Sequence, residues 1–159
     1  MDIHWIYYIQ LPSELRNCAK GLINMKNEDN ECFRWCHIRH LNPQDKDPQR
    51  IKKVDRQYVE KLDYSNIDFP VSVKHYRKIE KQNSINISVF GYEDRQPYPI
   101  YVSKEKYEDH MELLHVTKDE NKHYVLIKDF NKFMYNQTKH KERKNFLCTV
   151  YNVSALKEY

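Results

Sequence analysis

The spacing of hydrophobic residues along the chain changes from a helical to an alternating period about halfway through. Between residues 32 and 81 apolar side chains recur at three- and four-residue steps, whereas from Ile85 onward they alternate with polar ones. Helices followed by a meander of strands indicate an α+β architecture, because a parallel sheet would need a crossover helix between successive strands. We therefore predict N-terminal helices packed on a mostly antiparallel sheet of about four to six strands.

Capping residues, prolines and polar turns set the predicted element boundaries. Aromatic and β-branched residues predict an opening strand at residues 3–11, which ends at Pro12. Helices are predicted at residues 32–41, from Asp47-Pro48 to Leu62, and at residues 71–81. The strands predicted in the second half are residues 85–92, 99–103, 111–117 and 123–127, joined by turns such as 93–96 and 118–122.

The length of 159 residues suits one domain with one core. We place this domain at residues 1–140 and a basic tail at residues 141–159, because residues 136–145 carry lysine and arginine but no aliphatic or aromatic residue. Only 2 glycines occur, which excludes the glycine-rich loops that cradle phosphates in nucleotide-binding folds. A net charge of +4 is mild for a dedicated nucleic-acid binder.

The cysteines and the hydropathy predict an intracellular chain, in the cytoplasm or the nucleus. Cysteines stand at 18, 32, 36 and 148 without regular spacing, and a chain of this size does not need disulfides to fold. No apolar run approaches the ~20 residues that span a bilayer. The apolar stretch 3–11 lacks the basic lead-in and the small-residue cleavage site of a signal peptide. We expect a monomer with no cofactor and no membrane partner.

A thiol and an imidazole stand where cysteine chemistry needs them. Cys32 follows the polar turn 27–30 and opens a predicted helix, whose positive end stabilises a thiolate. His123 opens a predicted strand directly after a turn, and a rigid strand is a good mount for a general base. These two residues predict a nucleophile and base pair.

Further polar residues supply the other groups that acyl transfer requires. Asn27 and Asn30 precede the thiol and are the candidates for stabilising an oxyanion. Asp129 is the first carboxylate after the histidine strand and could orient the imidazole, with Asn131 and Asn121 as open alternatives. Six residues of straight strand span ~20 Å, so Asp129 can serve only if the chain bends back.

A zinc site is not predicted. Cys32, Cys36, His37 and His40 lie on barely two helical turns, and four ligands so placed cannot converge on one ion. Cys36 is expected to pack in the core.

Two short segments resemble the ubiquitin-specific proteases. Residues 21–33 look like the cysteine box of that family, with a Gly-Leu-x-Asn start followed by Asn-x-Cys and an aromatic residue. His123-Tyr124 is similar to the His-Tyr of its histidine box. The segment 21–33 is longer than that box, those proteases are far larger, and their Asp or Asn box has no clear counterpart here. The resemblance therefore implies a small papain-like deubiquitinase, of the size of herpesvirus tegument-type proteases.

The implied reaction is cleavage after the Gly-Gly tail of ubiquitin or a ubiquitin-like protein. A tail ending in two glycines would enter a narrow cleft, which Trp35 and Tyr124 are expected to wall.

A second resemblance covers residues 3–146. Motifs such as 27–35, 68–71, 87–90 and 123–128 look like the region that precedes the protein-primed B-type DNA polymerase of Polinton or Maverick transposons. A zinc-binding segment usually follows that region, and a frameshift is our hypothesis for its absence from residues 147–159. The alternative function is a non-catalytic nucleic-acid-binding module of such a polyprotein, supported by the basic residues of 49–61 and of the tail.

Overall fold

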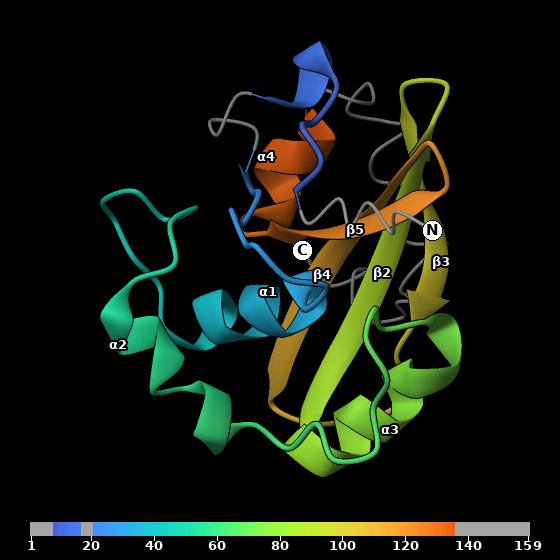
Figure 1. Ribbon diagram of the computed structural model, residues 1–159. Coiled ribbons are helices and arrows are strands. Elements are labelled where there is room, and N and C mark those ends of the chain that lie inside the picture. Colours follow the sequence, from blue (N-terminus) through green and yellow to red (C-terminus); the bar gives the residue numbers. More distant parts are fainter. Residues whose placement is uncertain (1–7, 17–20, 136–159) are drawn as a thin grey trace, which may run out of the picture.

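The computed structural model describes residues 8–16 and 21–135 of the chain. These residues form a five-stranded sheet with helices packed on both faces (Figure 1), which confirms the α+β class. The strands are β1 Leu22–Ile23, β2 Ile85–Glu93, β3 Gln96–Val102, β4 Asp109–Lys118 and β5 Asn121–Ile127. The helices are η1 Ser13–Leu15, α1 Cys32–Leu41, α2 Lys53–Arg56, η3 Val59–Lys61, α3 Val73–Asn83 and α4 Phe130–Tyr135.

The strands lie in the order β1-β5-β4-β2-β3, and all neighbours are antiparallel except β2 and β4. That parallel pair needs no crossover helix. After the tight β2–β3 hairpin, the chain returns through residues 103–108 to the other side of β2. Asp94 and Arg95 take positive φ in the hairpin turn, as two-residue hairpin loops require. The mostly antiparallel sheet is therefore confirmed.

One face of the sheet carries the larger core, covered by α1 and α3 (Figure 1). Phe33 of α1 lies at its centre, stacked 5.8 Å from Tyr76 of α3 and edge-on at 5.0 Å from Tyr124 of β5. The Tyr76 hydroxyl donates to the Tyr124 hydroxyl, which donates to the carbonyl of Val71. Buried hydroxyls are satisfied in this way without water.

The opposite face carries a second core beneath α4, η1 and the N-terminal segment. Leu114 and Val125 project from the central strands onto this face, and Phe133 and Met134 of α4 cover them. Side chains alternate between the two faces along each strand, so neighbours such as Tyr124 and Val125 belong to different cores.

One predicted element is wrong, and the described part of another is not a strand. Residues 8–11 of the predicted opening strand pair with none of the described strands, and residues 3–7 lie outside the described residues. The predicted helix from Asp47-Pro48 to Leu62 shrinks to α2 and η3, each under two turns. The sequence analysis also missed β1 and α4. The predicted boundary near residue 140 and the basic tail lie outside the described residues.

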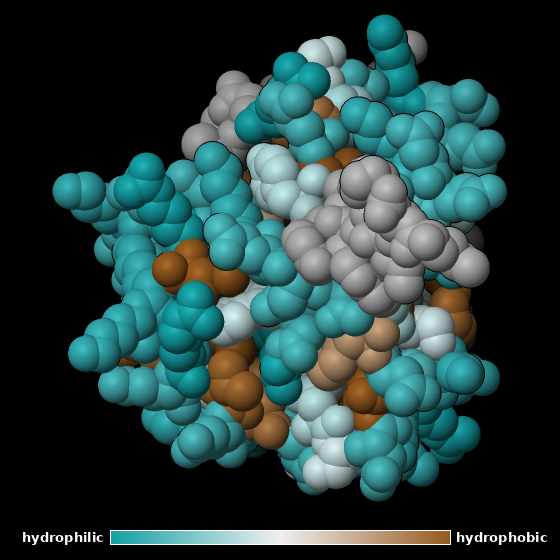
Figure 2. All heavy atoms as spheres, viewed as in Figure 1, coloured by the Kyte–Doolittle hydropathy of each residue, from teal (hydrophilic) through white to brown (hydrophobic). Residues whose placement is uncertain are grey.

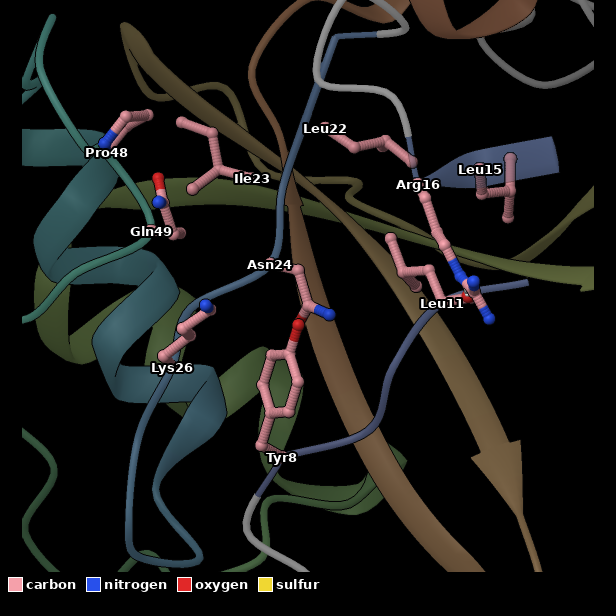
Figure 3. Close-up of a pocket in the computed structure, with 10 residues that line it drawn as sticks. All are labelled: Tyr8, Leu11, Leu15, Arg16, Leu22, Ile23, Asn24, Lys26, Pro48 and Gln49. Carbon is pink, nitrogen blue, oxygen red and sulfur yellow. Dashed lines mark hydrogen bonds between the residues drawn. The ribbon is translucent and has the colours of Figure 1, made fainter. Parts of the chain in front are cut away.

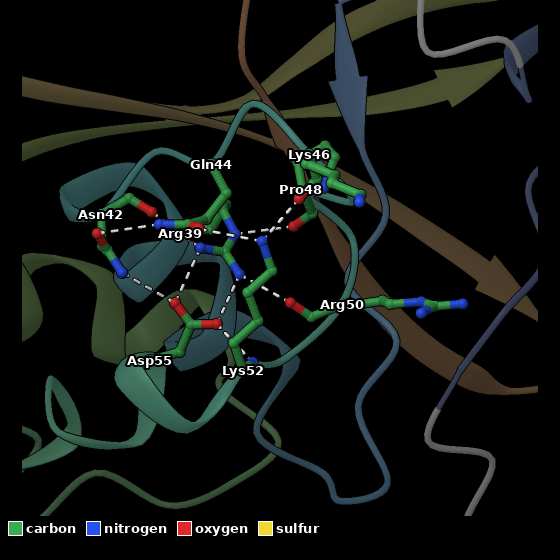
Figure 4. A network of polar contacts seen from close by, with 8 residues as sticks. All are labelled: Arg39, Asn42, Gln44, Lys46, Pro48, Arg50, Lys52 and Asp55. Carbon is green, nitrogen blue, oxygen red and sulfur yellow. Dashed lines mark hydrogen bonds and ion pairs between the residues drawn. The ribbon is translucent and has the colours of Figure 1, made fainter.

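A buried arginine organises the loop at residues 42–52, which includes the first part of the predicted helix 47–62. Arg39 donates to the carbonyls of Pro48, Asn42 and Arg50, and it forms a two-pronged ion pair with Asp55 (Figure 4). These carbonyls are directed to the guanidinium of Arg39, so they do not point along a helix axis toward amides four residues further on. The loop therefore wraps around Arg39, and the side chains of Arg39 and Asp55 are both fully buried.

Gly21 brings β1 against the end of β5, and its substitution is our first prediction. It has φ +76, and a Cβ added there would lie 2.3 Å from the backbone oxygen of Asp129. We expect Gly21→Ala to lower the free energy of unfolding by about 2 kcal/mol or more, measured by urea denaturation. Gly91→Ala is the control, because its Cβ would meet only the exposed ring of Tyr98, which can turn away. An equal loss in both variants would contradict the prediction.

The sheet ends in two different edges. One edge is β1, which has only two residues, and the other is β3, which carries Pro97 and Pro99. On the face of the molecule shown in Figure 2, hydrophobic residues form separate small areas within a mostly hydrophilic surface. Among the described residues, none of the helices has the length and apolar character that a membrane span requires.

Candidate functional site

Cys32 is the first residue of α1, as predicted, and its side chain is only 4% exposed. The thiol lies at the edge of β5, where the backbone N–H of Tyr124 is directed to the sulfur. Burial raises the pKa of the Cys32 thiol to about 11, although hydrogen bonds from the backbone amides of Tyr124 and Phe33 act in the opposite direction. The thiol is therefore protonated in this structure at neutral pH.

The second thiol of α1 meets the same residue of β5. Cys36 Sγ donates to the carbonyl of Tyr124 at 3.5 Å. β1 ends at Ile23, opposite Leu126, so the outer edge of β5 is free for α1 at this point. At Tyr124, the backbone N–H and C=O that would pair with a neighbouring strand are instead met by the two thiols of α1.

His123 precedes Tyr124, and strand alternation places its ring on the opposite face of the sheet. Its register partner Val116 packs in the core beneath α4, whereas Tyr124 packs against α1. The ring is 1% exposed, and its Nε2 lies 2.6 Å from Oδ1 of Asn24. Burial, with a smaller contribution from the charge of His115, lowers the pKa of His123 to about 4. The imidazole is therefore neutral at pH 7.

The contacts of Asn24 determine which nitrogen of His123 carries the proton. Asn24 Nδ2 donates to the carbonyl of Ile9 at 2.8 Å, so Oδ1 is the atom that faces the ring. A carbonyl oxygen can only accept, so Nε2 must be the protonated nitrogen. The lone pair of the neutral ring is then on Nδ1, which makes no hydrogen bond within the part of the chain that the structure describes. A histidine held in this tautomer is equipped to act as a base at Nδ1.

The structure brings Cys32 and His123 to adjacent positions along β5 but not into contact. The thiol meets the backbone of Tyr124, and the ring of His123 lies on the other side of the same strand. Among residues 8–16 and 21–135, no hydrogen bond or ion pair joins the two side chains.

The three residues proposed to orient the imidazole lie elsewhere. Asp129 accepts from the backbone N–H of Lys132 and caps α4, as an N-terminal capping residue does. Asn121 donates to the carbonyl of Asp119 in the β4–β5 turn, and Asn131 is exposed on α4. The structure places none of them on His123, and Asn24 occupies that position instead.

The residues expected to form an oxyanion hole and a cleft are buried or form hydrogen bonds near the start of α1. Asn27 donates to both the backbone and the carboxylate of Asp29, and its own Oδ1 is buried without a hydrogen-bond partner among the described residues. Asn30 donates to the carbonyl of Phe69. Trp35 donates from Nε1 to the Asp29 carboxylate and is 3% exposed. Tyr124 is 1% exposed, so neither ring is open to solvent as a cleft wall would be.

An open cavity adjoins the Asn24–His123 pair. It has a volume of about 290 Å³, and Figure 3 shows Asn24 and Tyr8 on its wall with apolar side chains such as Leu11 and Leu22. The Tyr8 ring also meets the His123 ring edge-on, with centroids 6.1 Å apart. The two residues that contact the imidazole therefore also face this cavity.

The remaining histidines of α1 have structural partners. Nδ1 of His37 lies 2.8 Å from the Tyr64 hydroxyl, within hydrogen-bond distance, and burial lowers the pKa of His37 to about 4. His40 lies 2.7 Å from a carboxylate oxygen of Asp109. Within the described ranges, no group of three or more His, Cys, Asp or Glu side chains could hold a metal ion.

Comparison with known proteins adds no family. No protein-family model, curated protein or solved structure matches the chain. The candidate site therefore depends on geometry, and its main addition to the predicted residues is Asn24. Asn24 is the asparagine of the Gly-Leu-x-Asn start of segment 21–33, so the motif was visible in the sequence, but its contact with His123 was not.

Proposed function

We propose that this chain is a thiol-dependent peptidase in which Cys32 is the nucleophile and His123 the general base. The observation that carries the proposal is the contact between Asn24 Oδ1 and His123 Nε2, which leaves the basic lone pair on Nδ1. Cys32 supports it from the first turn of α1, where backbone amides are directed to its sulfur. Asn24 is the positioning residue of this site.

The reaction begins from a neutral thiol and a neutral imidazole. The raised pKa of Cys32 and the lowered pKa of His123 both disfavour a resting thiolate–imidazolium pair. Proton transfer must therefore accompany attack on the substrate carbonyl, which is general-base catalysis. In the structure the two side chains lie on opposite faces of the sheet, so this step requires the start of β5 to rearrange when substrate binds and to bring Nδ1 within hydrogen-bond reach of Sγ. The backbone amide of Cys32 would then face the developing oxyanion.

Ubiquitin or a ubiquitin-like protein is the substrate class we propose. The support is the resemblance of segment 21–33 and of His123-Tyr124 to the ubiquitin-specific proteases. The cavity beside Asn24 offers a partly apolar surface for the residues that precede a Gly-Gly tail.

The test is covalent labelling with ubiquitin that carries a C-terminal propargyl group. We expect a mass increase of one ubiquitin in the unaltered protein and none in Cys32→Ala. Cys36→Ala is the matched control, because that thiol is buried on the same helix and meets the same Tyr124 backbone, and it should retain labelling. Asn24→Ala should slow labelling and shift its dependence on pH, because the tautomer of His123 is no longer fixed.

Two results would contradict the proposal. One is labelling that persists in Cys32→Ala, which would place the nucleophile elsewhere. The other is the absence of labelling by ubiquitin combined with a Cys32 thiol that does not react with a small alkylating reagent in the folded protein. That result would show that Cys32 is a structural residue of the core.

A further inference from the structure

A second, polar cavity is lined in part by cationic side chains. It has a volume of about 390 Å³ and lies between the start of α1 and the segment that leads into α2. Three cations from different parts of the chain line it: Lys26, Arg50 and Arg56. All three are exposed, and they share the cavity with Trp35, Glu28 and Asp29.

Backbone pairing holds two of these cations next to each other. Lys26 and Arg50 form an isolated parallel β-bridge, and the backbone N–H of Lys26 donates to the carbonyl of Gln49 at 2.9 Å. Paired residues project their side chains to the same side, and like charges so placed repel each other. Figure 4 shows the Arg50 side chain directed away from the Arg39 network, which engages only its carbonyl. The fold therefore places two cationic residues side by side at this cavity.

The third cation is positioned by an aromatic ring. The guanidinium of Arg56 lies over the Trp35 ring, 5.7 Å from its centroid. This cation–π contact leaves the N–H groups of Arg56 available to a ligand. Trp35 is itself fixed by the hydrogen bonds from its Nε1 to Asp29.

Within the described residues, none of the three cations forms an ion pair, although two carboxylates lie in the same cavity. Asp29 is occupied by N–H donors, since it accepts from the Trp35 ring, the Glu31 backbone and the Asn27 amide. Arg39, in contrast, has its charge matched by the buried Asp55. Three cationic groups thus line one cavity together with the carboxylates of Glu28 and Asp29, and no ion pair joins the two sets within the described residues.

We propose that Lys26, Arg50 and Arg56 form a binding site for a phosphate group. Each of the two guanidinium groups can donate two hydrogen bonds to phosphate oxygens, and the ammonium group can act as a single point charge. A phosphate has the charge and the number of oxygens to engage all three. Lys53 is exposed between Arg50 and Arg56 in sequence, so a phosphate chain could continue along this segment. The phosphate could belong to a nucleic-acid strand or to a free phosphoryl ligand. The site is independent of Cys32 and His123.

The test uses the full chain and a short labelled single-stranded oligonucleotide, with binding measured by fluorescence anisotropy over a range of salt. We expect Lys26→Gln/Arg50→Gln/Arg56→Gln to weaken binding and to reduce the slope of log affinity against log salt by about 2, at roughly 0.7 for each lost phosphate contact. The control Lys74→Gln/Lys81→Gln/Arg95→Gln removes the same charge from exposed positions on α3 and the β2–β3 turn, and it should keep the slope.

Competition distinguishes the two sources of phosphate. Displacement of the oligonucleotide by inorganic phosphate at constant ionic strength would identify a site for an isolated phosphate, and resistance to it would identify a strand-binding site. If the triple variant melts at a lower temperature, the salt dependence of binding is measured for the single variant Arg50→Gln instead, because the Arg50 side chain is exposed. The proposal is overturned if the control loses as much affinity as the triple variant, if a glutamate-rich peptide binds as tightly as the oligonucleotide at equal salt, or if neither phosphate ligand binds.

Discussion

Replacing Arg39 with methionine should lower the free energy of unfolding by about 3–5 kcal/mol, because it leaves the carboxylate of Asp55 buried without a cation. The three backbone carbonyls that Arg39 holds would also lose their donor. Burial raises the pKa of Asp55, but hydrogen bonds from Arg39, from the Lys52 backbone and from Asn42 lower it more. The carboxylate therefore stays ionised in the folded protein. Urea denaturation at pH 7 measures the loss.

Arg34→Met is the matched control for this prediction. It is the same substitution on the same helix, but the pair that Arg34 forms with Glu31 is partly exposed, so we expect a loss of about 1 kcal/mol or less. The double variant Arg39→Met/Asp55→Leu should lose less than the sum of its two single variants, because no unpaired charge remains. Equal losses for Arg39→Met and Arg34→Met would contradict the role that we assign to the Arg39 network.

Acid should destabilise the folded protein between about pH 6.5 and pH 4, and two buried histidines should account for much of the effect. His123 and His37 each have a folded-state pKa lowered from 6.5 to about 4 by burial. Above pH 6.5 both are neutral whether the chain is folded or not, so their contribution to stability is fully present. As the pH falls toward 4, the unfolded chain binds protons that the folded chain does not bind. Each histidine should cost about 3 kcal/mol over this interval.

The measurement is the free energy of unfolding at several pH values for the unaltered protein and for His123→Gln. Glutamine cannot bind a proton in this range, so this variant should lose about 3 kcal/mol less between pH 6.5 and pH 4. His37→Gln should show a similar reduction, and the two should add, because the residues lie on different faces of the sheet. An unchanged pH dependence in His123→Gln, or an NMR titration of the His123 ring near pH 6.5 in the folded protein, would disagree with this prediction.

Periodicity predicted most of the fold because the elements concerned are long and their cores dominate their sequence. Helix 32–41 and the strands at 85–92, 111–117 and 123–127 lie within one or two residues of α1, β2, β4 and β5. The predicted helix from Asp47 failed because its apolar spacing is real but its backbone carbonyls are held by Arg39 from another element. β1 was missed because two residues carry no period of their own and depend on pairing with β5.

The candidate site was predicted only in part, for reasons specific to each residue. The position of Cys32 at the start of a helix follows from local capping and a polar turn, which sequence reveals. The partner of His123 does not follow from local sequence. Asn24 lies 99 positions away along the chain and is brought to His123 by the pairing of β1 with β5. Asp129 was chosen for its nearness along the chain, but its local role as a cap for α4 takes its carboxylate. Alternation along β5 could have shown that His123 and Tyr124 face different cores.

The two edges of the sheet limit how copies of this chain can associate. An exposed strand with free N–H groups is a template on which another chain can add a strand. β3 carries Pro97 and Pro99, which have no N–H to donate, and β1 presents only two residues. Beyond β1, the edge of β5 at Tyr124 is closed by the two thiols of α1. The described part of the sheet therefore leaves little free edge on which a second copy could add a strand.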